Sequence, residues 1–526
     1  MKKSSLLLTL GAMVLSGAYA SAAPASSEDM ELAAENIKRA SKIMDITWSR
    51  ASIGKDGDFG LKDQIHFKTS IDFGPSDVWP YTAAIEAHNS MLEALEAIKK
   101  WNPTVYDTYY SKYRSRLDQL IDNLEWYRGT YSLASYATEA KDVSPYAVPR
   151  AGQRGGANVT GILNVYDDQE WLARELIRAY RVTDNEDYLD LATYLVDYVL
   201  EGWDCWRDNE GNEYGGITWG PGYNSKHACS NAPMVQPLVW LHDIYKGTEE
   251  TMEYAYRNEN NEVVTEIVER EDHYLMFAKK IYDWQKDHLY DKGKKVFYDM
   301  LGADNTIIVE GGYRQHMDTG NATGAFISYN TGTMISGAAE LCRVTGEHSY
   351  ADDINDFIDG SWREFATYVR RPVATYVLKT DASYENGFNT WFNDVLLRSY
   401  VDAIPYADTD GKKPLQYIGY HQTNLDYAFE NNNVNNLLPI NLLDGWGDEV
   451  RTKPFHQFSF AAEYALFAKQ LIGDGLTGIE EVASAPAVAD NLVYNLHGVC
   501  LGEYNEVKET LPAGIYVVNS AKVVIK

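Results

Sequence analysis

The chain has 526 residues and a formal net charge of −29, with 76 acidic against 47 basic side chains. This excess of negative charge argues against nucleic acid and anionic membrane surfaces as partners, because both require clustered Lys and Arg. Hydrophobic residues make up 45% of the chain, and its 39 tyrosines and 13 tryptophans offer flat apolar faces. A large buried core and a neutral ligand therefore fit the composition better than a charged partner.

The N-terminus has the pattern of an export signal. Lys2-Lys3 precede an apolar run from Leu6 to Val14, and Ala18-Tyr19-Ala20 offers a small-x-small cleavage site. The run is too short for a membrane-spanning helix, and no second long apolar stretch follows it. We therefore expect residues 1–20 to be a signal peptide, and the mature protein to be exported without a membrane span.

Helical periodicity then continues through most of the chain. One apolar stripe runs from Met91 to Ile98 after Trp79-Pro80, and another from Tyr274 to Trp284. Further helices are predicted near residues 30–48, 104–128, 168–181, 186–202, 226–245, 326–344, 348–368, 388–403, 412–430 and 455–472. The segment from Met252 to Arg270 interrupts this pattern with two alternating runs around an Asn-rich centre, which predicts a β-hairpin insertion.

Two of the helix pairs repeat a short motif. Arg181-Val182-Thr183 is followed by Tyr188, and Arg343-Val344-Thr345 is followed by Tyr350 at the same spacing. Each copy indicates the end of one helix, a short turn and the start of the next. Repeated helix pairs bury their faces on neighbouring pairs, in a solenoid or a closed ring, and about twelve helices make the six pairs of an all-α (α/α)6 toroid.

The C-terminal residues differ in character. Short β-period runs at 492–494, 499–501, 514–518 and 522–525 predict a small β module after an Ala-, Ser- and Pro-rich stretch. We therefore divide the mature chain into a toroid at 28–475, a linker at 476–490 and a β tail at 491–526. The run from Leu511 to Val518 resembles the C-terminal tails of secreted Bacteroidetes proteins, which implies a sorting or attachment role.

The four cysteines show no metal-ligand spacing. They are Cys205, Cys229, Cys342 and Cys500, and they allow three complete pairings. Proximity favours a bridge between Cys205 and Cys229, with free thiols as the alternative. No Gly-rich phosphate loop or zinc motif is present, so neither a metal nor a cofactor is expected.

Two pairs of adjacent carboxylates stand out, Asp167-Asp168 and Asp352-Asp353. Such pairs also arise by chance in an acidic chain, and acidic residues are common in first helical turns. Counting back equally from the two Arg-Val-Thr copies, Asp168 corresponds to Asn330, and both begin the first helix of a pair. First helices would form the inner ring with their starts on one rim, whereas Asp352-Asp353 would be solvated charge on an outer helix. Paired carboxylates on the inner rim favour glycoside hydrolysis.

Five blocks of the sequence, in this order, resemble those of glycoside hydrolase family 76, the endo-α-1,6-mannanases. They are Trp79-Pro80-Tyr81, Tyr166-Asp167-Asp168-Gln169, Gly215 to Trp219, Lys226 to Asn231, and Tyr329 to Gly332. The resemblance covers residues 77–472. It implies an (α/α)6 barrel, in agreement with the helix count, and α-mannan polysaccharide or oligosaccharide as the partner.

The resemblance also assigns roles to the central pair. Asp167 would be the nucleophile and Asp168 the general acid/base of a retaining double displacement, which needs carboxyls roughly 5–5.5 Å apart. A helix N-terminus favours an ionised nucleophile. Like-charge repulsion raises the pKa of the neighbouring acid, and the pair titrates as a unit.

Six further residues are candidate sugar ligands: Trp79, Trp219, Lys226, Asn231, Asn330 and Trp391. Each also has a structural interpretation, since the tryptophans suit a helical core, the asparagines suit helix caps and the lysine suits a rim charge. Asp72 and Asp77 are candidate extra acids, with N-capping the alternative for Asp77.

Three other functions remain open from the sequence. A different enzyme on the same barrel, such as an unsaturated glycuronyl hydrolase, is disfavoured by the negative charge, because its substrate is anionic. A non-catalytic mannan-binding protein would need no carboxylate pair. A transglycosylase differs from a hydrolase only in its acceptor.

Overall fold

The computed structural model describes residues 26–66, 69, 73–302, 306–369, 375–379, 389–408, 411–473, 492–495, 500–508, 514–518 and 521–525. The chain forms two compact units, Met1–Asp474 and Gly475–Lys526. The expected signal peptide, the linker and Asp72 lie outside the described residues. Among the described helices, none has the length and apolar character required to cross a membrane.

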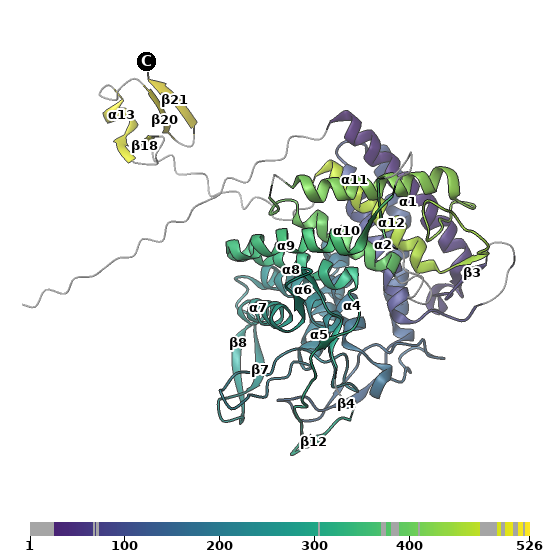
Figure 1. Cartoon of the computed structure of the whole chain (residues 1–526), viewed down its shortest axis with the longest axis vertical. Coiled ribbons are helices and arrows are strands. Elements are labelled where there is room, and N and C mark those ends of the chain that lie inside the picture. Colours follow the sequence, from purple (N-terminus) through teal and green to yellow (C-terminus); the bar gives the residue numbers. More distant parts are fainter. Residues whose placement is uncertain are drawn as a thin grey trace, which may run out of the picture. The chain divides into compact units, whose positions relative to one another are not determined.

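The first unit is built from helices (Figure 1). In chain order they are α1 (Ser27–Ala51), α2 (Val78–Ile98), α3 (Pro103–Asp122), α4 (Tyr166–Thr183), α5 (Glu186–Leu200), α6 (Ala232–Tyr245), α7 (Arg270–Leu289), α8 (Ser328–Thr345), α9 (His348–Phe365), α10 (Asn389–Ala403), α11 (Lys412–Tyr427) and α12 (Pro454–Ile472). Each predicted helical run has a counterpart. The largest difference is at α6, where the predicted first turn is instead a short strand and a 3₁₀ turn.

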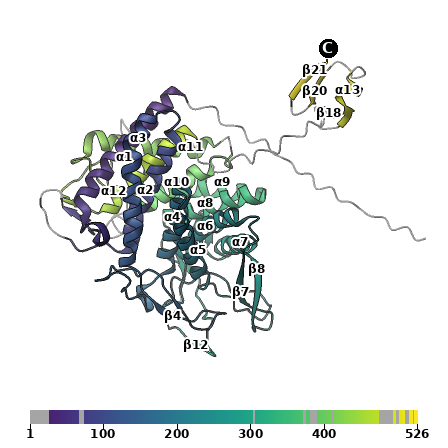
Figure 2. The ribbon, with the colours of Figure 1, turned by 180° about the vertical axis from the view of Figure 1, so that it is seen from behind.

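The even-numbered helices form a closed inner ring. Helices α2, α4, α6, α8, α10 and α12 each pack against the next, and α12 packs against α2 to complete the circle. Helices α3, α5, α7, α9 and α11 each lie outside the inner helix that precedes them, and α1 packs on α12 (Figures 1 and 2). Inner helices such as α2 and α12 are buried along most of their residues. The predicted (α/α)6 toroid is confirmed.

The repeated Arg-Val-Thr motif ends an inner helix in both copies. Helix α4 ends at Thr183 and α8 ends at Thr345, and each is followed by a residue in the left-handed region. These residues are Asp184 (φ 53°) and Gly346 (φ 70°), and the N–H of each donates to the carbonyl four residues back. This is the usual C-terminal cap that turns the chain out of a helix.

The strands of the first unit are short and lie in the connections between helices. They are β1 (Ser52–Ile53), β2 (Gly60–Leu61), β3 (Ile65–His66), β4 (Tyr131–Leu133), β5 (Lys141–Val143), β6 (Lys226–His227), β7 (Thr251–Arg257), β8 (Val263–Glu269), β9 (Tyr290–Asp291), β10 (Val296–Phe297), β11 (Met300–Leu301), β12 (Val309–Glu310), β13 (Tyr313–Arg314), β14 (Ala322–Thr323), β15 (Ala366–Tyr368), β16 (Tyr376–Leu378) and β17 (Arg451–Thr452). Strands β7 and β8 are antiparallel over their full length, which confirms the predicted hairpin.

The second unit contains an antiparallel sheet of four strands in the order β19-β18-β20-β21. Its elements are β18 (Leu492–Asn495), β19 (Cys500–Glu503), the short helix α13 (Tyr504–Val507), β20 (Gly514–Val518) and β21 (Ala521–Ile525). These strands fall on the four β-period runs of the sequence.

The second aspartate pair lies on the outer helix α9. Asp352 has 75% of its side chain exposed, as predicted. The prediction is wrong for Asp353, whose side chain is only 15% exposed. Its Oδ2 accepts hydrogen bonds from the Tyr282 hydroxyl at 2.8 Å and from Lys286 Nζ at 2.5 Å. Asp353 therefore joins α9 to α7.

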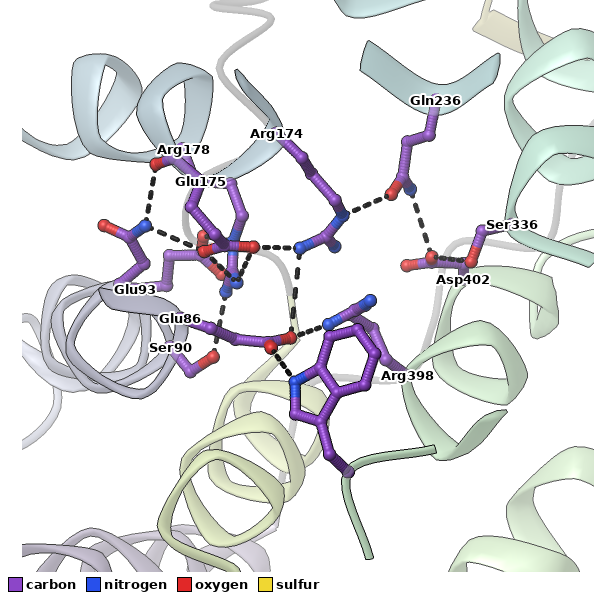
Figure 3. A network of polar contacts seen from close by, with 12 residues as sticks. Glu86, Ser90, Glu93, Arg174, Glu175, Arg178, Gln236, Ser336, Arg398 and Asp402 are labelled. Carbon is purple, nitrogen blue, oxygen red and sulfur yellow. Dashed lines mark hydrogen bonds and ion pairs between the residues drawn. The ribbon is translucent and has the colours of Figure 1, made fainter. Parts of the chain in front are cut away.

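A network of buried ion pairs crosses the inside of the ring (Figure 3). On α4, Arg174 and Arg178 both pair with Glu175, and Arg178 Nε donates to Glu93 of α2 at 2.7 Å. Arg174 also donates to Gln236 of α6, at 3.1 Å. The chain of contacts continues from Gln236 to Asp402 of α10, which accepts from Ser336 of α8. Because most of these side chains are shielded from water, the positive and negative groups must form ion pairs and hydrogen bonds with one another.

We expect Glu175→Ala to lower the free energy of unfolding by about 3–5 kcal/mol, because it leaves two buried guanidinium groups without a shared carboxylate. Asp359→Ala is the matched control, since its ion pair with Lys413 is 43–48% exposed and should contribute less than about 1 kcal/mol. Chemical denaturation of both variants measures the difference. Equal losses would contradict a structural role for the network.

Candidate active site

The Asp167-Asp168 pair lies in the first turn of α4, which is anchored on both flanks. The backbone N–H of Tyr166 donates to the Trp219 carbonyl at 2.8 Å. The side chain of Gln169 accepts from the N–H of Tyr146 at 2.9 Å and donates to its carbonyl at 2.8 Å. These bonds tie the start of the helix to two loops, so the carboxyls project from a fixed position.

Several donors surround the half-buried carboxylate of Asp167. Trp219 Nε1 donates to its Oδ2 at 3.2 Å, and the backbone N–H of Asp168 donates to its Oδ1 at 2.9 Å. The nearby Cys229 thiol also lowers the pKa of this carboxyl and so favours its ionised form. Burial raises the pKa of Asp167 to about 6, and these hydrogen bonds oppose the rise. The carboxylate form is therefore supported although water is largely excluded.

Asp168 has the opposite environment. It is 7% exposed, and within the described part of the chain no group donates a hydrogen bond to its carboxyl. Burial raises its pKa well above the usual range, and the negative charges of Asp167 and Asp77 add to the rise. The two adjacent carboxyls thus differ in environment, and the ionised form is better supported at Asp167 than at Asp168.

The first turns of the inner helices meet at this rim. Trp171 of α4, Tyr329 of α8, Trp391 of α10 and Phe455 of α12 form one buried cluster with Cys229, which lies just before α6. The half-buried rings of Trp79, Trp219 and Phe392 pack against it. The expectation that inner helices start on one shared rim is confirmed.

The three tryptophans that are candidate sugar ligands differ in how deeply they are buried. Trp391 is 2% exposed and packs edge-on to Trp171, at a centroid distance of 4.6 Å, so it belongs to the core. Its Nε1 donates to Glu86 Oε2 at 2.8 Å. Trp79 and Trp219 are only half-buried, and Trp219 stacks on His227 at 4.7 Å. The core interpretation therefore fits Trp391, and a role as sugar ligand stays a prediction for each of the three tryptophans.

Lys226 is neither a rim charge nor a group free to reach a sugar. It is 3% exposed, and its Nζ donates to Asp204 Oδ2 at 2.9 Å and to the Gly215 carbonyl at 2.5 Å. His316 Nδ1 also lies 2.7 Å from Asp204 Oδ2. Although burial opposes ionisation, Lys226 and His316 hold the pKa of Asp204 below its usual value.

The side chain of Asn231 joins two backbone segments by hydrogen bonds. Its Oδ1 accepts from the N–H of Ile217 at 2.8 Å, and its Nδ2 donates to the carbonyls of Ile217 and His227 at 2.9 and 2.7 Å. Asn231 stands at the N-cap position of α6, but its side chain makes no capping bond. The capping interpretation is therefore wrong, and the role of sugar ligand stays a prediction. These bonds hold the loop that contains Ile217 and Trp219 against the turn that contains Cys229.

Glycine is required in the loop that Asn231 holds. Gly216 has a φ of 77°, and a Cβ atom there would lie 2.4 Å from the indole of Trp284. Larger residues would therefore displace the ring or the loop. The Gly-rich block thus allows the loop to pass close to α7. Trp219 follows in the same loop and lies at the rim.

Asn330 is fully buried in the first turn of α8, and within the described residues neither atom of its side-chain amide has a hydrogen-bond partner. Its role as a sugar ligand stays a prediction. Burial raises the pKa of the nearby Asp299. The charge of Asp299 also acts on Cys229 and Tyr329. A third carboxyl therefore borders the site, and sequence reasoning missed it because Asp299 stands in a short connection without any flanking motif.

Glu170 was also missed. Its side chain is fully buried one turn after Asp167, and within the described residues neither carboxyl oxygen has a hydrogen-bond partner. Burial and the charge of Asp167 raise its pKa well above the usual range. A neutral carboxyl is expected there. The acidic composition of the chain gave no reason to single it out.

Two minor expectations are corrected. Asp77 occupies the N-cap position of α2, but its side chain makes no capping bond. Cys205 and Cys229 are both free and buried, as is Cys342, so the bridge favoured by proximity is not formed. In the described residues, no group of three or more His, Cys, Asp or Glu side chains is arranged to hold a metal ion.

Comparisons with known proteins agree with the sequence blocks. The family model for glycosyl hydrolase family 76 matches residues 155–257 and 265–415, which include Asp167, Asp168 and Asn330. No curated protein matches the chain. The resemblance to family 76 is thereby confirmed.

Solved structures of this family share the fold. A family 76 mannosidase from Bacteroides thetaiotaomicron VPI-5482 matches with a TM-score of 0.60 and 20% identity, over 82% of this chain and 98% of that one. An α-1,6-mannanase from Salegentibacter sp. HEL1_6 matches with a TM-score of 0.54 and 20% identity, over 83% and 100%. An inactive variant of that mannanase, with two adjacent aspartates replaced by asparagine, is in complex with α-1,6-mannotriose and matches equally well.

We expect Lys226→Met to lower the free energy of unfolding by about 3–5 kcal/mol, because it leaves the buried charge of Asp204 short of a partner. A sugar-contacting lysine would instead raise KM without changing stability. Denaturation and steady-state kinetics on the same preparation separate the two results. Lys413→Met, which removes an exposed lysine, is the control and should change neither.

Proposed function

We propose that this chain, a member of glycoside hydrolase family 76, is an exported enzyme that cleaves α-1,6-mannosidic linkages of mannan with retention of configuration. One observation carries the proposal: two adjacent carboxyls at one helix start have opposite environments, one with hydrogen-bond donors and one buried without them. Asp167 accepts hydrogen bonds from Trp219 and from a backbone N–H, whereas Asp168 is buried beside its charge. A retaining glycosidase requires one ionised and one protonated carboxyl.

In the first step Asp167 attacks the anomeric carbon, while Asp168 gives its proton to the departing glycosidic oxygen. The bond from the anomeric carbon to that oxygen breaks as the bond to Asp167 forms. In the second step Asp168, now ionised, removes a proton from water, and the resulting hydroxide displaces Asp167. The N-terminus of α4 lowers the energy of the carboxylate form in both steps.

Asp168 must act as an acid in the first step and as a base in the second, and its burial beside Asp167 helps it to change between the two. While Asp167 carries its charge, that charge and the loss of solvent keep Asp168 protonated, so that it acts as an acid. Once Asp167 is bonded to the sugar it is neutral. The repulsion then ends, and the proton-free form of Asp168 is easier to maintain as a base.

The substrate class is supported by the surroundings of the pair and by the related structures. The half-buried rings of Trp79, Trp219 and Phe392 at the rim suit the apolar face of a neutral sugar. The matching Salegentibacter enzyme is described as an α-1,6-mannanase, and its inactive variant lacks two adjacent aspartates. We take Asp167-Asp168 to be the corresponding pair.

Product analysis on linear α-1,6-mannan distinguishes this proposal from the other candidates. A retaining hydrolase releases reducing sugars of which the first-formed anomer is α, as observed by proton NMR. Binding without any product would indicate a mannan-binding protein, and products longer than the substrate would indicate a transglycosylase. Cleavage of unsaturated glycuronides alone would indicate the other barrel enzyme.

Export is a separate part of the proposal and rests on residues 1–20. N-terminal sequencing of the protein recovered from the producing cell's periplasm, surface or medium tests it. A mature chain that begins just after Ala20 supports export, and an uncleaved N-terminus contradicts it. The role of the β tail in sorting is tested by whether deleting residues 491–526 changes where the protein is found.

Replacing either central carboxyl should nearly abolish turnover. We expect Asp167→Asn and Asp168→Asn each to lower kcat by roughly three orders of magnitude or more, because each removes a group that acts in both steps. Asp352→Asn is the control, since that aspartate is exposed on the outer helix α9. Near-normal kcat in either central variant would contradict the assignment.

The pH dependence of kcat/KM should be bell-shaped. Activity rises with pH as Asp167 loses its proton, and the pKa of that carboxyl is raised by burial to about 6. Activity falls at higher pH as Asp168 loses its proton, because the acid is then absent. A profile that stays flat from pH 4 to pH 9, roughly the range that spans both limbs, would contradict the assignment of roles.

A further inference from the structure

The loop of Trp219 is fixed to the start of α4 at two levels. The indole Nε1 donates to Asp167 Oδ2 at 3.2 Å. The carbonyl of Trp219 accepts from the N–H of Tyr166, the residue before Asp167, at 2.8 Å. The two segments lie so close that a Cβ atom at Gly220 would be 2.6 Å from the carbonyl oxygen of Asn164. The indole and the carboxylate are therefore held at a fixed separation.

The orientation of the indole is set by His227. The two rings stack with their centroids 4.7 Å apart and their planes 22° apart. Ser225 joins them, because its carbonyl accepts from the N–H of Trp219 at 2.9 Å and its hydroxyl lies 3.0 Å from His227 Nε2. Burial lowers the pKa of His227 to about 4, so its ring is neutral above that pH. His227 therefore supports the indole without placing a positive charge near Asp167.

The titratable groups around Asp167 do not compensate its charge. That charge raises the pKa of side chains on each surrounding element: Asp168 and Glu170 of α4, Tyr223 of the loop, Cys229 of the turn before α6, and Tyr329 of α8. Each of these groups is neutral or negative, so none acts as a counter-charge. Hydrogen bonds from N–H groups support the carboxylate instead, and the indole of Trp219 supplies one of them.

We propose that Trp219, held by His227, is a positioning residue that fixes the orientation of the Asp167 carboxylate through its indole N–H. This inference rests on the proposed function and gives Trp219 a role that does not require contact with the sugar. The indole binds Oδ2, and the backbone N–H of Asp168 binds Oδ1 at 2.9 Å. Rotation about the Cβ–Cγ bond of Asp167 would break both bonds. The carboxylate therefore meets the anomeric carbon in one orientation, which lowers the barrier to attack.

The experiment removes the indole N–H and retains the ring. Benzothienylalanine, an isostere of tryptophan with sulfur in place of the N–H, replaces Trp219, and kinetics are measured on linear α-1,6-mannan. Because the indole bond lowers the pKa of Asp167, its loss should move the acidic limb of kcat/KM up by roughly one pH unit and lower kcat about tenfold. KM should stay unchanged, since the aromatic face remains. A sugar platform alone predicts that neither kcat nor the limb changes, and that result would overturn the proposal.

Trp240 is the matched control, because its Nε1 also donates to a carboxylate, that of Glu340, at 2.8 Å. The two residues lie in the C-terminal halves of α6 and α8, away from the rim at which the inner helices start. The same replacement at Trp240 should leave kcat and the acidic limb unchanged. An equal shift of the limb at both tryptophans would overturn the proposal.

Two variants of His227 test its support of the indole. His227→Leu removes the flat ring and should move the acidic limb in the same direction, by less than the loss of the N–H does. His227→Phe keeps a flat ring and should leave the limb near its wild-type position. Equal shifts in the two variants would contradict a role for the stacked ring.

Nuclear magnetic resonance of the indole N–H groups tests the hydrogen bond without any substrate. The resonance of Trp219 is identified as the one lost when benzothienylalanine replaces it. It should shift as pH passes through the pKa of Asp167, because a carboxylate is a stronger acceptor than a carboxylic acid. The shift should be absent in Asp167→Asn. A resonance that does not respond to pH would overturn the inference. If the wild type shows the shift but cleaves no mannan, only the proposed function fails.

Discussion

The closed inner ring is the constraint on which the rest of this structure depends. Six helices that touch one another on two sides and an outer layer on a third leave little surface in water, so the polar groups inside must satisfy each other. Glu86 of α2 shows how far this requirement extends. Its carboxylate pairs with Arg398 of α10 and accepts from the indole of Trp391. One carboxylate thus links the ionic interior to the aromatic cluster at the rim.

At the rim, the same lack of water differentiates two chemically identical side chains. Asp167 lies where α4 and the loop of Trp219 meet, and each supplies a donor. Asp168 is adjacent in sequence but buried beside that charge. Sequence adjacency makes the two charges interact strongly, and the surrounding elements decide which of them is tolerated. An acid and a nucleophile thereby arise from one dipeptide.

Several candidates from the sequence became structural residues once their surroundings were visible. Lys226, Asn231 and Trp391 are all buried, and each turns its polar atoms toward the protein. Lys226 binds Asp204, Asn231 binds the backbone of Ile217, and Trp391 binds Glu86. Conversely, Asp299 and Glu170 border the pair without any motif to mark them. Residue type and spacing do not reveal where a side chain points when both directions are buried.

The sequence by itself determined the helix count, the (α/α)6 ring, the hairpin insertion and the position of Asp167-Asp168 at the start of an inner helix. These features follow from local periodicity and from the repeated Arg-Val-Thr motif, both of which act over short stretches of chain. Only the tertiary structure decided that hydrogen-bond donors reach Asp167, that Asp353 is tied to α7 and that Lys226 is buried against Asp204. These depend on contacts between helices far apart in the sequence, and on the removal of water that occurs only when the ring closes.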